Sequence, residues 1–471
     1  MKNIILKSFV LIILFFNSSL SQEIVDGRWE GGISIMEINL EIIVSFETVN
    51  DSLRGTIEIP KQSNEKIPLS NIICDFHNLN FTILISPSNA VFSGVIVNDS
   101  IAGSFTQSGT SGTFYLTKTT ETKEGVSKDE VLPYVEKEVT FHNDDIKFSG
   151  TLTLPEYPGK HPAVVMITGS GPQDRDEEIY SFKIFKMIAD HFTKNGIAVL
   201  RYDDRGIGGS TGNISESTTE DFAGDVIEAV KYLQTRNDIR HDNIGLCGHS
   251  EGGIVAPLAA SNYKDIAFII LMAGTGVTGE EVIIEQTELI LKAEGIADEE
   301  IKESLVQSKK LFSDLRSGKE KEEIISELRK QILENYEHMT EEQKELITDK
   351  DEYADKTANS KYDQLTSPWM SFFLSYDPVP ALEKVTCPVL MLFGELDLQV
   401  SVAQNEKPMI DALVRGNNKD FEVKTFPKAN HLFQEANTGS PSEYADLQKE
   451  FTQGFLDFMS SWVLERFSVS R

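Results

Sequence analysis

The five-residue stretch 248–252, Gly-His-Ser-Glu-Gly, constrains the fold of this chain more than any other part of it. An apolar run, 243–247, precedes the stretch, and a run typical of a helix, 254–261, follows it. The serine, Ser250, therefore lies at a sharp turn from a strand into a helix, where flanking glycines avoid a clash because they have no Cβ. This context predicts a nucleophile elbow; a chance glycine-rich turn is the alternative.

The sequence after Pro155 alternates between apolar runs typical of buried strands and amphipathic runs typical of helices. This alternation predicts a mostly parallel central sheet with helices on both faces. Two further strands are expected within 135–154. The expected later strands are 163–167, 197–202, 243–247, 267–273, 388–393 and 421–426, and the expected helices are 182–194, 222–235, 254–261 and 444–465.

Short strands separated by turn residues are expected in residues 22–119, which predicts a small all-β N-terminal domain, either a sandwich or a barrel. Trp29 is expected in its core. A polar linker, 120–135, separates this domain from a larger one, 136–471. The expected strands of the small domain are 33–46, 53–59, 79–85, 90–97, 101–105 and 113–117.

A charged, helix-forming segment, about 278–366, interrupts the larger domain between two late strands. Its position predicts a helical cap at the carboxyl edge of the sheet; a helical spacer with no part in binding is the alternative. The aromatic stretch 368–373 is expected to return the chain to the core near the pocket.

Length, charge and the N-terminus restrict the classes of partner and the location. A chain of 471 residues predicts two or three folding units, and a net charge of −30 argues against nucleic acid or anionic lipid as a partner. Residues 1–21 combine two lysines, an apolar core and small residues, which predicts a signal peptide and export to the periplasm or outside the cell. The apolar run is shorter than the about 20 residues that span a bilayer, so no stable membrane insertion is expected after cleavage; an uncleaved anchor is the alternative.

Neither disulfides nor a metal are expected. The cysteines Cys74, Cys247 and Cys387 are an odd and sparse set, which is not a disulfide framework. The histidines, cysteines and carboxylates show no metal-binding spacing. We therefore expect no cofactor.

A serine hydroxyl is almost fully protonated at neutral pH and needs a base within hydrogen-bond reach. His431 follows the last expected strand and is the predicted general base, whereas the turn is expected to direct the side chain of His249 elsewhere. The imidazole in turn needs a carboxylate. Asp397 is the favoured acid because it follows a strand at the same edge of the sheet; Glu395 and Glu435 are the other candidates. The chain order serine, acid, histidine is that of enzymes with this elbow.

An oxyanion hole needs two backbone N–H groups near the serine. The N–H group of Glu251, directly after the nucleophile, is the first expected donor. The second is expected in the glycine loop after strand 163–167, with Ser170 as first choice and Gly171 as second.

Three charged residues near this loop could be mistaken for catalytic groups. Arg201, Asp203 and Arg205 follow one another at a strand end. We expect them to form a buried salt-bridge network that braces the elbow.

Five short motifs occur in the larger domain. They are Gly-Ser-Gly-Pro-Gln-Asp-Arg-Asp at 169–176, Arg-Tyr-Asp-Asp-Arg-Gly at 201–206, Gly-His-Ser-Glu-Gly-Gly at 248–253, Gly-Glu-Leu-Asp at 394–397 and Asn-His at 430–431. Together they resemble the motifs of the capped bacterial carboxylesterases of the EstD type, which group with the serine aminopeptidase-like (S33) hydrolases of the α/β-hydrolase superfamily. The resemblance covers about residues 136–471 and implies the α/β-hydrolase fold, an additional N-terminal domain and hydrolysis of short acyl esters. The sequence departs from the family at Thr168, where many relatives have histidine.

The sequence therefore predicts an exported serine hydrolase that cleaves small carboxylic esters through Ser250, His431 and Asp397. One alternative is a peptidase that binds the amine of a short peptide through cap carboxylates such as Glu285 or Glu288. Another is a binding module whose β-domain engages glycan or envelope while the hydrolase is vestigial. The sequence leaves the oligomeric state open.

Overall fold

The computed structural model describes residues 25, 27–119, 132–180 and 182–467, with gaps at 36–37, 50–51, 60–62, 76–77, 84–89, 98–99 and 108–109 and through most of 338–348. The expected signal peptide, 1–21, and most of the expected linker, 120–135, lie outside the described residues.

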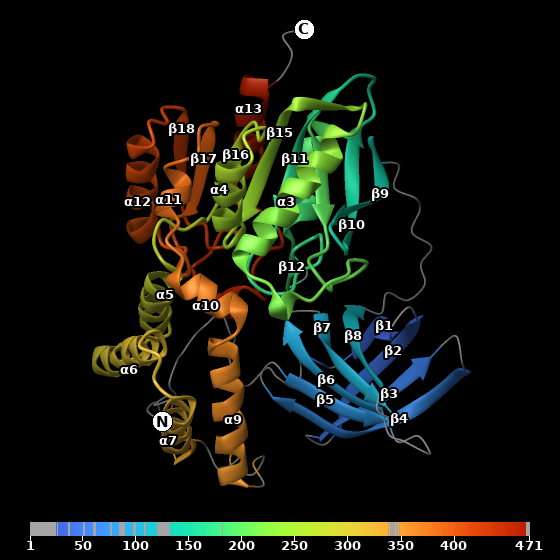
Figure 1. The fold of residues 1–471 in the computed structure, drawn as a ribbon, viewed down its shortest axis with the longest axis vertical. Coiled ribbons are helices and arrows are strands. Elements are labelled where there is room, and N and C mark those ends of the chain that lie inside the picture. Colours follow the sequence, from blue (N-terminus) through green and yellow to red (C-terminus); the bar gives the residue numbers. More distant parts are fainter. Residues whose placement is uncertain are drawn as a thin grey trace.

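The N-terminal strands form a closed antiparallel barrel (Figure 1). Each strand pairs with the next in sequence, and the last pairs with the first. Of the two architectures that the sequence allows, the barrel is the one present. The strands are β1 (Gly27–Ile35), β2 (Ile38–Val49), β3 (Ser52–Ile59), β4 (Ser63–Asp75), β5 (Asn78–Ile83), β6 (Ala90–Val97), β7 (Ser100–Gln107) and β8 (Thr110–Thr119).

Two strands of the barrel differ from expectation. The single expected strand, 33–46, is divided between β1 and β2, because residues 36–37, Met-Glu, contain none of the residue types that usually mark a turn. β4 was not expected, since its mixed polar sequence with a central proline is not typical of a strand.

Aromatic side chains fill the barrel. Trp29 is fully buried, as expected, and its indole N–H donates a hydrogen bond to the carbonyl oxygen of Val25 at 2.8 Å. The rings of Phe81 and Phe92 stack with centroids 4.5 Å apart, and Phe114 packs edge-on against both. The interior is therefore a packed core, as is common for barrels of this size.

The larger domain contains a mostly parallel sheet in the order β18-β17-β16-β15-β11-β14-β10-β9. Only the pairs that involve β10 are antiparallel, and a short ribbon of β12 (Glu178–Ile179) and β13 (Phe182–Lys183) stands apart. The strands of the sheet are β9 (Tyr134–Asn143), β10 (Ile146–Pro155), β11 (His161–Ile167), β14 (Ala198–Tyr202), β15 (Ile239–His249), β16 (Ile269–Met272), β17 (Val389–Gly394) and β18 (Phe421–Phe426).

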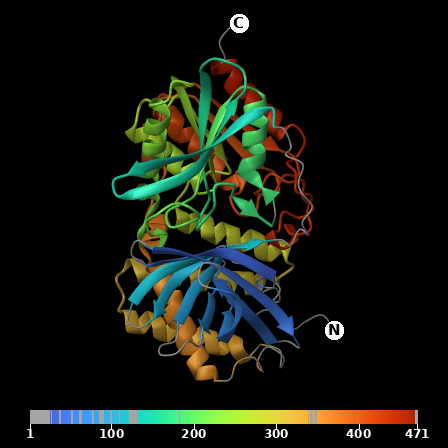
Figure 2. The same cartoon turned by 90° about the vertical axis from the view of Figure 1, so that its right-hand side faces the viewer.

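Helices cover both faces of this sheet (Figures 1 and 2). One face packs against α3 (Thr219–Gln234), α4 (Gly252–Asn262), α11 (Val379–Leu382) and α12 (Val402–Arg415), and the other against α2 (Ile184–Lys194) and α13 (Phe455–Phe467). β11 is buried along its whole length and sends alternate side chains into the two cores, as a central parallel strand does. Short 3₁₀ turns occur at Ile214–Glu216 and Pro441–Glu443.

The closing helix is shorter than the expected helix, 444–465. It begins at Phe455 because the preceding residue, Gly454, has a φ of 79°, outside the right-handed helical region. Tyr444 instead lies buried in the apolar core between the sheet and the helices α2 and α13.

A group of helices is inserted between the neighbouring strands β16 and β17, at the carboxyl edge of the sheet. These inserted helices have their own apolar core, which includes Ile283, Phe312, Leu328 and Met370, and Ile254 of α4 joins it. Both views place the inserted helices and the barrel at the same end of the sheet domain (Figures 1 and 2). The helices are α5 (Gly279–Ala293), α6 (Asp298–Arg316), α7 (Lys321–Glu337), α9 (Lys350–Leu365) and α10 (Pro368–Ser375). Among the described residues, no helix combines the length and apolar character that crossing a membrane requires.

Candidate active site

The turn at Ser250 has the backbone of a nucleophile elbow. Ser250 adopts a φ of 52°, a conformation that costs energy in a residue with a side chain, and its N–H donates to the carbonyl oxygen of Met272 at 2.8 Å. The neighbouring chain is very close. A Cβ on Gly248 would lie 2.0 Å from the oxygen of Gly252, and a Cβ on Gly252 would lie 2.2 Å from the oxygen of Ile167. The two glycines are therefore sterically required, as the sequence predicts.

Asp397 and His431 form a buried hydrogen-bonded pair. His431 Nδ1 lies 2.8 Å from Asp397 Oδ2, and the two residues are only 4% and 3% exposed. The other carboxylate oxygen accepts the N–H groups of Gln399 and Val400, each at 2.8 Å. Since a carboxylate oxygen accepts, Nδ1 of His431 carries the proton. Its Nε2 atom has no hydrogen-bond partner in the described part of the chain, so its lone pair is available to a reacting group.

The two other candidate acids have different partners. Glu395 is exposed and accepts the N–H of Lys428 at 2.9 Å, and Glu435 lies 3.3 Å from the ammonium group of the same lysine. Of the three candidates, Asp397 is the one that contacts His431.

The His431 loop packs against the elbow through His249. The ring centroids of His249 and His431 are 4.8 Å apart, and His249 Nε2 lies 3.0 Å from the carbonyl oxygen of His431. The structure thus brings the acid and the histidine into direct contact and places the histidine beside the neighbour of Ser250. Within the described residues it has no hydrogen bond between the Ser250 hydroxyl and the His431 ring.

The glycine loop after β11 lies beside the serine. A Cβ on Gly169 would lie 3.4 Å from Ser250 Cβ, and the N–H of Gly169 donates to Glu177 Oε1 at 2.7 Å. The backbone N–H groups of Ser170 and Glu251, in contrast, have no acceptor in the part of the chain that the structure describes. Both N–H groups near the serine are therefore available to bind an oxyanion.

Asp204 holds the two ends of this loop. One of its carboxylate oxygens accepts from the Thr168 hydroxyl at 2.8 Å and the other from the N–H of Gln173 at 2.9 Å. Burial raises the pKa of Asp204 well above its ordinary value, although these two hydrogen bonds oppose the rise. Thr168, the position at which the sequence departs from many relatives, thus fixes the loop through Asp204.

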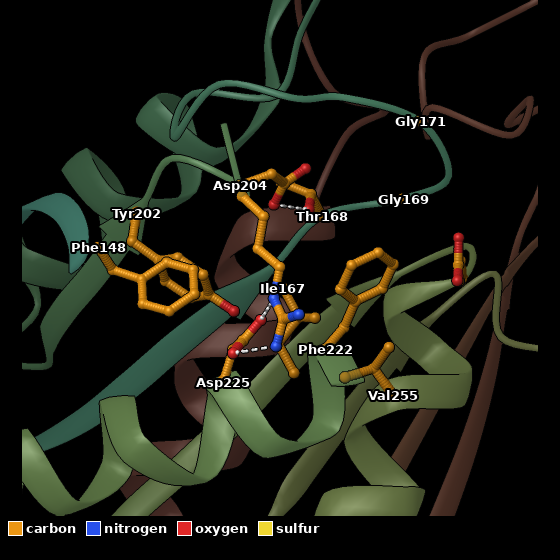
Figure 3. Close-up of a pocket in the computed structure, with 12 residues that line it drawn as sticks. Phe148, Ile167, Thr168, Gly169, Gly171, Tyr202, Asp204, Phe222, Asp225 and Val255 are labelled. Carbon is orange, nitrogen blue, oxygen red and sulfur yellow. Dashed lines mark hydrogen bonds and ion pairs between the residues drawn. The ribbon is translucent and has the colours of Figure 1, made fainter. Parts of the chain in front are cut away.

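A small cavity lies behind the loop (Figure 3). Its volume is about 20 Å³, which leaves room for about one water molecule. The cavity reaches the elbow, because Glu251 is part of its lining. The other lining residues are Phe148, Ile167, Thr168, Gly169, Gly171, Tyr202, Asp204, Arg205, Phe222, Asp225 and Val255.

A buried acid and histidine that the sequence did not assign, Glu177 and His249, connect these loops. Glu177 Oε1 accepts from Gly169 and lies 3.0 Å from His249 Nδ1, and both side chains are almost fully buried. Because the carbonyl oxygen of His431 can only accept, Nε2 of His249 must donate, and an ionised Glu177 requires Nδ1 to donate as well. Burial alone would lower the pKa of His249, but the charge and hydrogen bond of Glu177 outweigh burial and raise it. The pair thus links the loop of Gly169 to the loop of His431.

The sequence around Glu177 contains a signal for this buried pair. The acidic run 176–178 overlaps the end of the glycine-rich motif 169–176, whose Gly169 donates its N–H to Glu177. Glu177 also has a φ of 46°, so its backbone stores strain next to the elbow.

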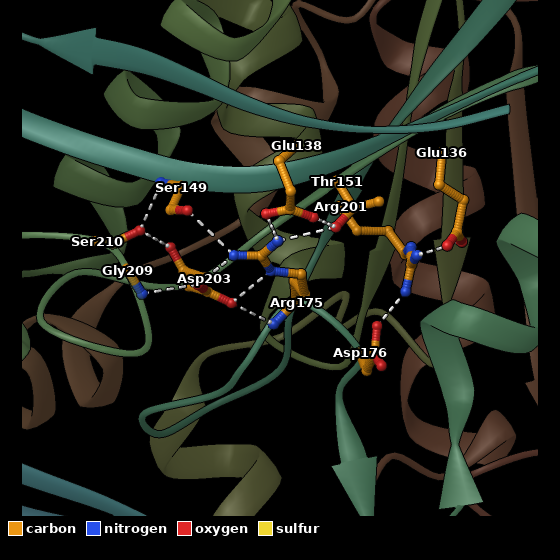
Figure 4. A network of polar contacts seen from close by, with 10 residues as sticks. All are labelled: Glu136, Glu138, Ser149, Thr151, Arg175, Asp176, Arg201, Asp203, Gly209 and Ser210. Carbon is orange, nitrogen blue, oxygen red and sulfur yellow. Dashed lines mark hydrogen bonds and ion pairs between the residues drawn. The ribbon is translucent and has the colours of Figure 1, made fainter. Parts of the chain in front are cut away.

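Arg201 and Asp203 lie in ion pairs with different partners (Figure 4). Arg205 lies in a further ion pair, so all three residues form salt bridges as expected. Asp203 accepts two hydrogen bonds from the guanidinium of Arg175, at 2.9 and 2.7 Å. Arg201 pairs with Asp176 and Glu136, and Arg205 pairs with Asp225. These partners lie on β9, α3 and the loop after β11. None of them belongs to the elbow.

The described residues contain no group of three or more histidine, cysteine, aspartate or glutamate side chains that could hold a metal ion. Of the three cysteines, Cys247 is buried, and Cys74 and Cys387 are half-buried.

Several known proteins are similar to this chain. The family model for serine aminopeptidases, S33, matches residues 180–436. Esterase EstD of Thermotoga maritima is 27% identical over 350 residues, which cover 73% of this chain and 72% of EstD. Thiohydrolase aneE of Aspergillus aculeatus is 36% identical over 128 residues, which are 27% of this chain and 37% of that protein. A solved esterase of Pyrococcus furiosus, Pf2001, has a TM-score of 0.43 and 15% identity, with 73% of this chain and 95% of that chain covered.

The family match spans more than half of the chain and includes the elbow and the acid–histidine pair. The EstD match extends the likeness beyond these residues. The chain belongs to the serine aminopeptidase (S33) family of α/β-hydrolases and is a serine hydrolase of the esterase type.

Proposed function

We propose that this hydrolase cleaves small carboxylic esters through a Ser250-His431-Asp397 triad and an acyl-enzyme. The observation that carries the proposal is the buried 2.8 Å hydrogen bond between Asp397 and His431, in a loop that packs against the strained elbow of Ser250. The imidazole then has a fixed tautomer, with a free Nε2 that can accept the serine proton.

Each step of the proposed reaction uses a group placed at this edge of the sheet. Nε2 of His431 takes the proton of Ser250 while the serine oxygen attacks the acyl carbonyl. The N–H groups of Glu251 and Ser170 bind the resulting oxyanion, and each such donor typically contributes about 100- to 1000-fold in rate. The alcohol leaves with the proton from His431. Water, deprotonated by the same histidine, then releases the acid and restores Ser250.

The inserted helices are proposed to act as a cap over the acyl or leaving-group pocket. They lie at the carboxyl edge of the sheet, and their apolar core includes Ile254, four positions after the nucleophile. A cap that shares its core with α4 would lie close to bound substrate.

The preference for short acyl chains and export complete the proposal. The first rests on the resemblance of the motifs to those of EstD-type carboxylesterases. The second rests on the lysines, apolar core and small residues of 1–21.

The inserted helices favour peptide substrates less than esters, because the carboxylates considered for binding a substrate amine have other partners. Of the two carboxylates considered for binding a substrate amine, Glu285 accepts a hydrogen bond from Ser401 at 2.6 Å. Glu288 pairs with Lys292 on the surface. Both are engaged elsewhere, so esters are the favoured substrates.

Fluorophosphonate labelling combined with a substrate panel tests the proposal. The wild-type protein should be labelled, Ser250→Ala should not, and Ser261→Ala, a matched change on α4, should behave like the wild type. Acetyl to decanoyl nitrophenyl esters should be cleaved faster than amino-acid arylamides, with the shortest esters fastest. An unlabelled wild-type protein would indicate a vestigial site, and faster cleavage of arylamides would indicate a peptidase.

A further inference from the structure

The side chain of Glu251 joins three parts of the molecule. Its carboxylate is buried, with 3% of the residue exposed. Oε1 accepts the hydroxyl hydrogen of Thr219, the first residue of α3, at 2.7 Å. The indole N–H of Trp369, on the inserted helix α10, lies 2.8 Å from Oε1 and 3.0 Å from Oε2. This buried carboxylate thus accepts hydrogen bonds both from the sheet domain and from the inserted helices.

The same residue provides a proposed oxyanion donor. The N–H of Glu251 follows Ser250 directly and has no acceptor in the described part of the chain. Burial raises the pKa of Glu251, whereas the side chains of Thr219, Trp369 and Ser170 lower it. Ser170, the other proposed donor residue, therefore lies close to this carboxylate. A displacement of the Glu251 side chain would act on both donors of the oxyanion hole.

Trp369 is firmly held within the inserted helices. Its ring stacks on Phe373 with centroids 5.3 Å apart and planes at 13°, and both residues belong to the apolar core of the insertion. The start of α10 is fixed by Ser367, whose side chain accepts the N–H of Met370, and by Pro368 in the first turn. Movement of the insertion would therefore move the indole N–H relative to Glu251.

We propose that Trp369 is a positioning residue for the oxyanion hole, which it couples to the inserted helices through the carboxylate of Glu251. The inference rests on the proposed function. With the indole in place, the carboxylate is fully hydrogen-bonded and the N–H groups of Glu251 and Ser170 are aligned. Substrate that packs against α10 thereby affects the rate of acyl transfer and not only binding. Trp369 itself need not contact the reacting atoms.

The test compares two tryptophan variants that each lose one indole N–H. Trp369→Phe removes the donor to Glu251, whereas Trp462→Phe removes an N–H that has no partner among the described residues. Since leaving a buried acceptor without its donor costs about 10- to 100-fold in an equilibrium, we expect Trp369→Phe to lower kcat for a short ester by about that factor and to change KM less than about threefold. Trp462→Phe should retain kcat within about twofold.

A double-mutant cycle distinguishes a specific effect of Trp369 on Glu251 from a general loss of packing around α10. In a Glu251→Ala background, Trp369→Phe should cost far less than in the wild type, because the side-chain acceptor that needs the donor is gone. If Trp369→Phe fails to fold, as a melting curve would show, site-specific benzothienylalanine at position 369 removes only the N–H and keeps the ring shape.

The outcomes distinguish this inference from the proposed function. A Trp369→Phe protein with wild-type kcat, or with a change confined to KM, would refute the coupling and leave the ester hydrolase intact. Equal loss of kcat in both tryptophan variants would also refute it. Failure of fluorophosphonate to label wild-type Ser250 would instead refute the triad on which both proposals depend.

Discussion

Replacement of Asp397 by asparagine tests the triad most directly, because the structure separates its effect on chemistry from its effect on folding. One oxygen of Asp397 accepts two backbone N–H groups, and an asparagine carbonyl can keep both hydrogen bonds. The other oxygen accepts from His431 Nδ1, and an amide nitrogen there can only donate. His431 must then carry its proton on Nε2, where it can no longer accept the proton of Ser250.

The expected loss of activity is large. The equivalent substitution in a serine protease triad lowers kcat by about 10⁴-fold, which corresponds to about 5.5 kcal/mol. Because the backbone hydrogen bonds are retained here and the site is buried, we expect Asp397→Asn to lower kcat by about 10³- to 10⁴-fold. The melting temperature should change by no more than a few degrees.

The assay is nitrophenyl acetate hydrolysis at pH 7.5, with thermal melting of the same samples. Glu395→Gln is the matched control, because Glu395 is an exposed acid two positions away that does not contact His431. It should retain full activity. A folded Asp397→Asn protein with more than a tenth of wild-type kcat would show that Asp397 does not orient the general base.

Two further predictions concern stability. Burial, with the negative charge of Asp176, raises the pKa of Asp174 to about 6. The folded state therefore binds this proton more tightly than the unfolded state does. As a result, the free energy of unfolding falls as the pH rises from about 4 to about 6. Asp174→Asn should therefore raise the free energy of unfolding in urea by about 1–3 kcal/mol at pH 7.5 and have little effect at pH 4, and a loss at pH 7.5 would contradict this reasoning. Gly252→Ala should lower stability by more than about 3 kcal/mol or prevent folding, because its Cβ would lie 2.2 Å from a backbone oxygen of β11. Gly224→Ala lies within α3, where a Cβ would make only an ordinary contact of 3.5 Å with Asn143 Nδ2. It should raise stability by about 0.5–1 kcal/mol in the same urea titration, and similar losses in both variants would argue against the close packing at the elbow.

Much of the site follows from sequence because it depends on local pattern and on one rule of topology. The strand, glycine, serine, glycine and helix around Ser250 predict the turn that the structure contains. Parallel strands end at one edge of a sheet, so residues that follow β17 and β18, Asp397 and His431, are brought to that edge. Neither inference requires knowledge of a side-chain direction.

The contacts that sequence reasoning missed depend on such directions. Glu177 and His249 are 72 positions apart, and Glu251 and Trp369 are 118 apart. Each pair meets because a tight turn determines the direction of a side chain. The hydrophobic periodicity of the sequence does not predict side-chain directions at turns. The late start of the closing helix, at Phe455 instead of 444, has a similar origin, since the unusual φ of Gly454 is not visible in helix-forming composition.

The place at which the helices are inserted has an evolutionary consequence. β16 and β17 are adjacent parallel strands, so the chain leaves the sheet on one strand and returns on its neighbour, about 4.8 Å away. The entropy of closing a loop grows only with the logarithm of its length, so segments of very different length can be inserted at this junction without a shift of register. The residues that follow β17 and β18 keep their places on the sheet when the insertion changes. The hydrogen bond to Glu251 limits that freedom, because a replaced insertion must supply its own donor to the same carboxylate.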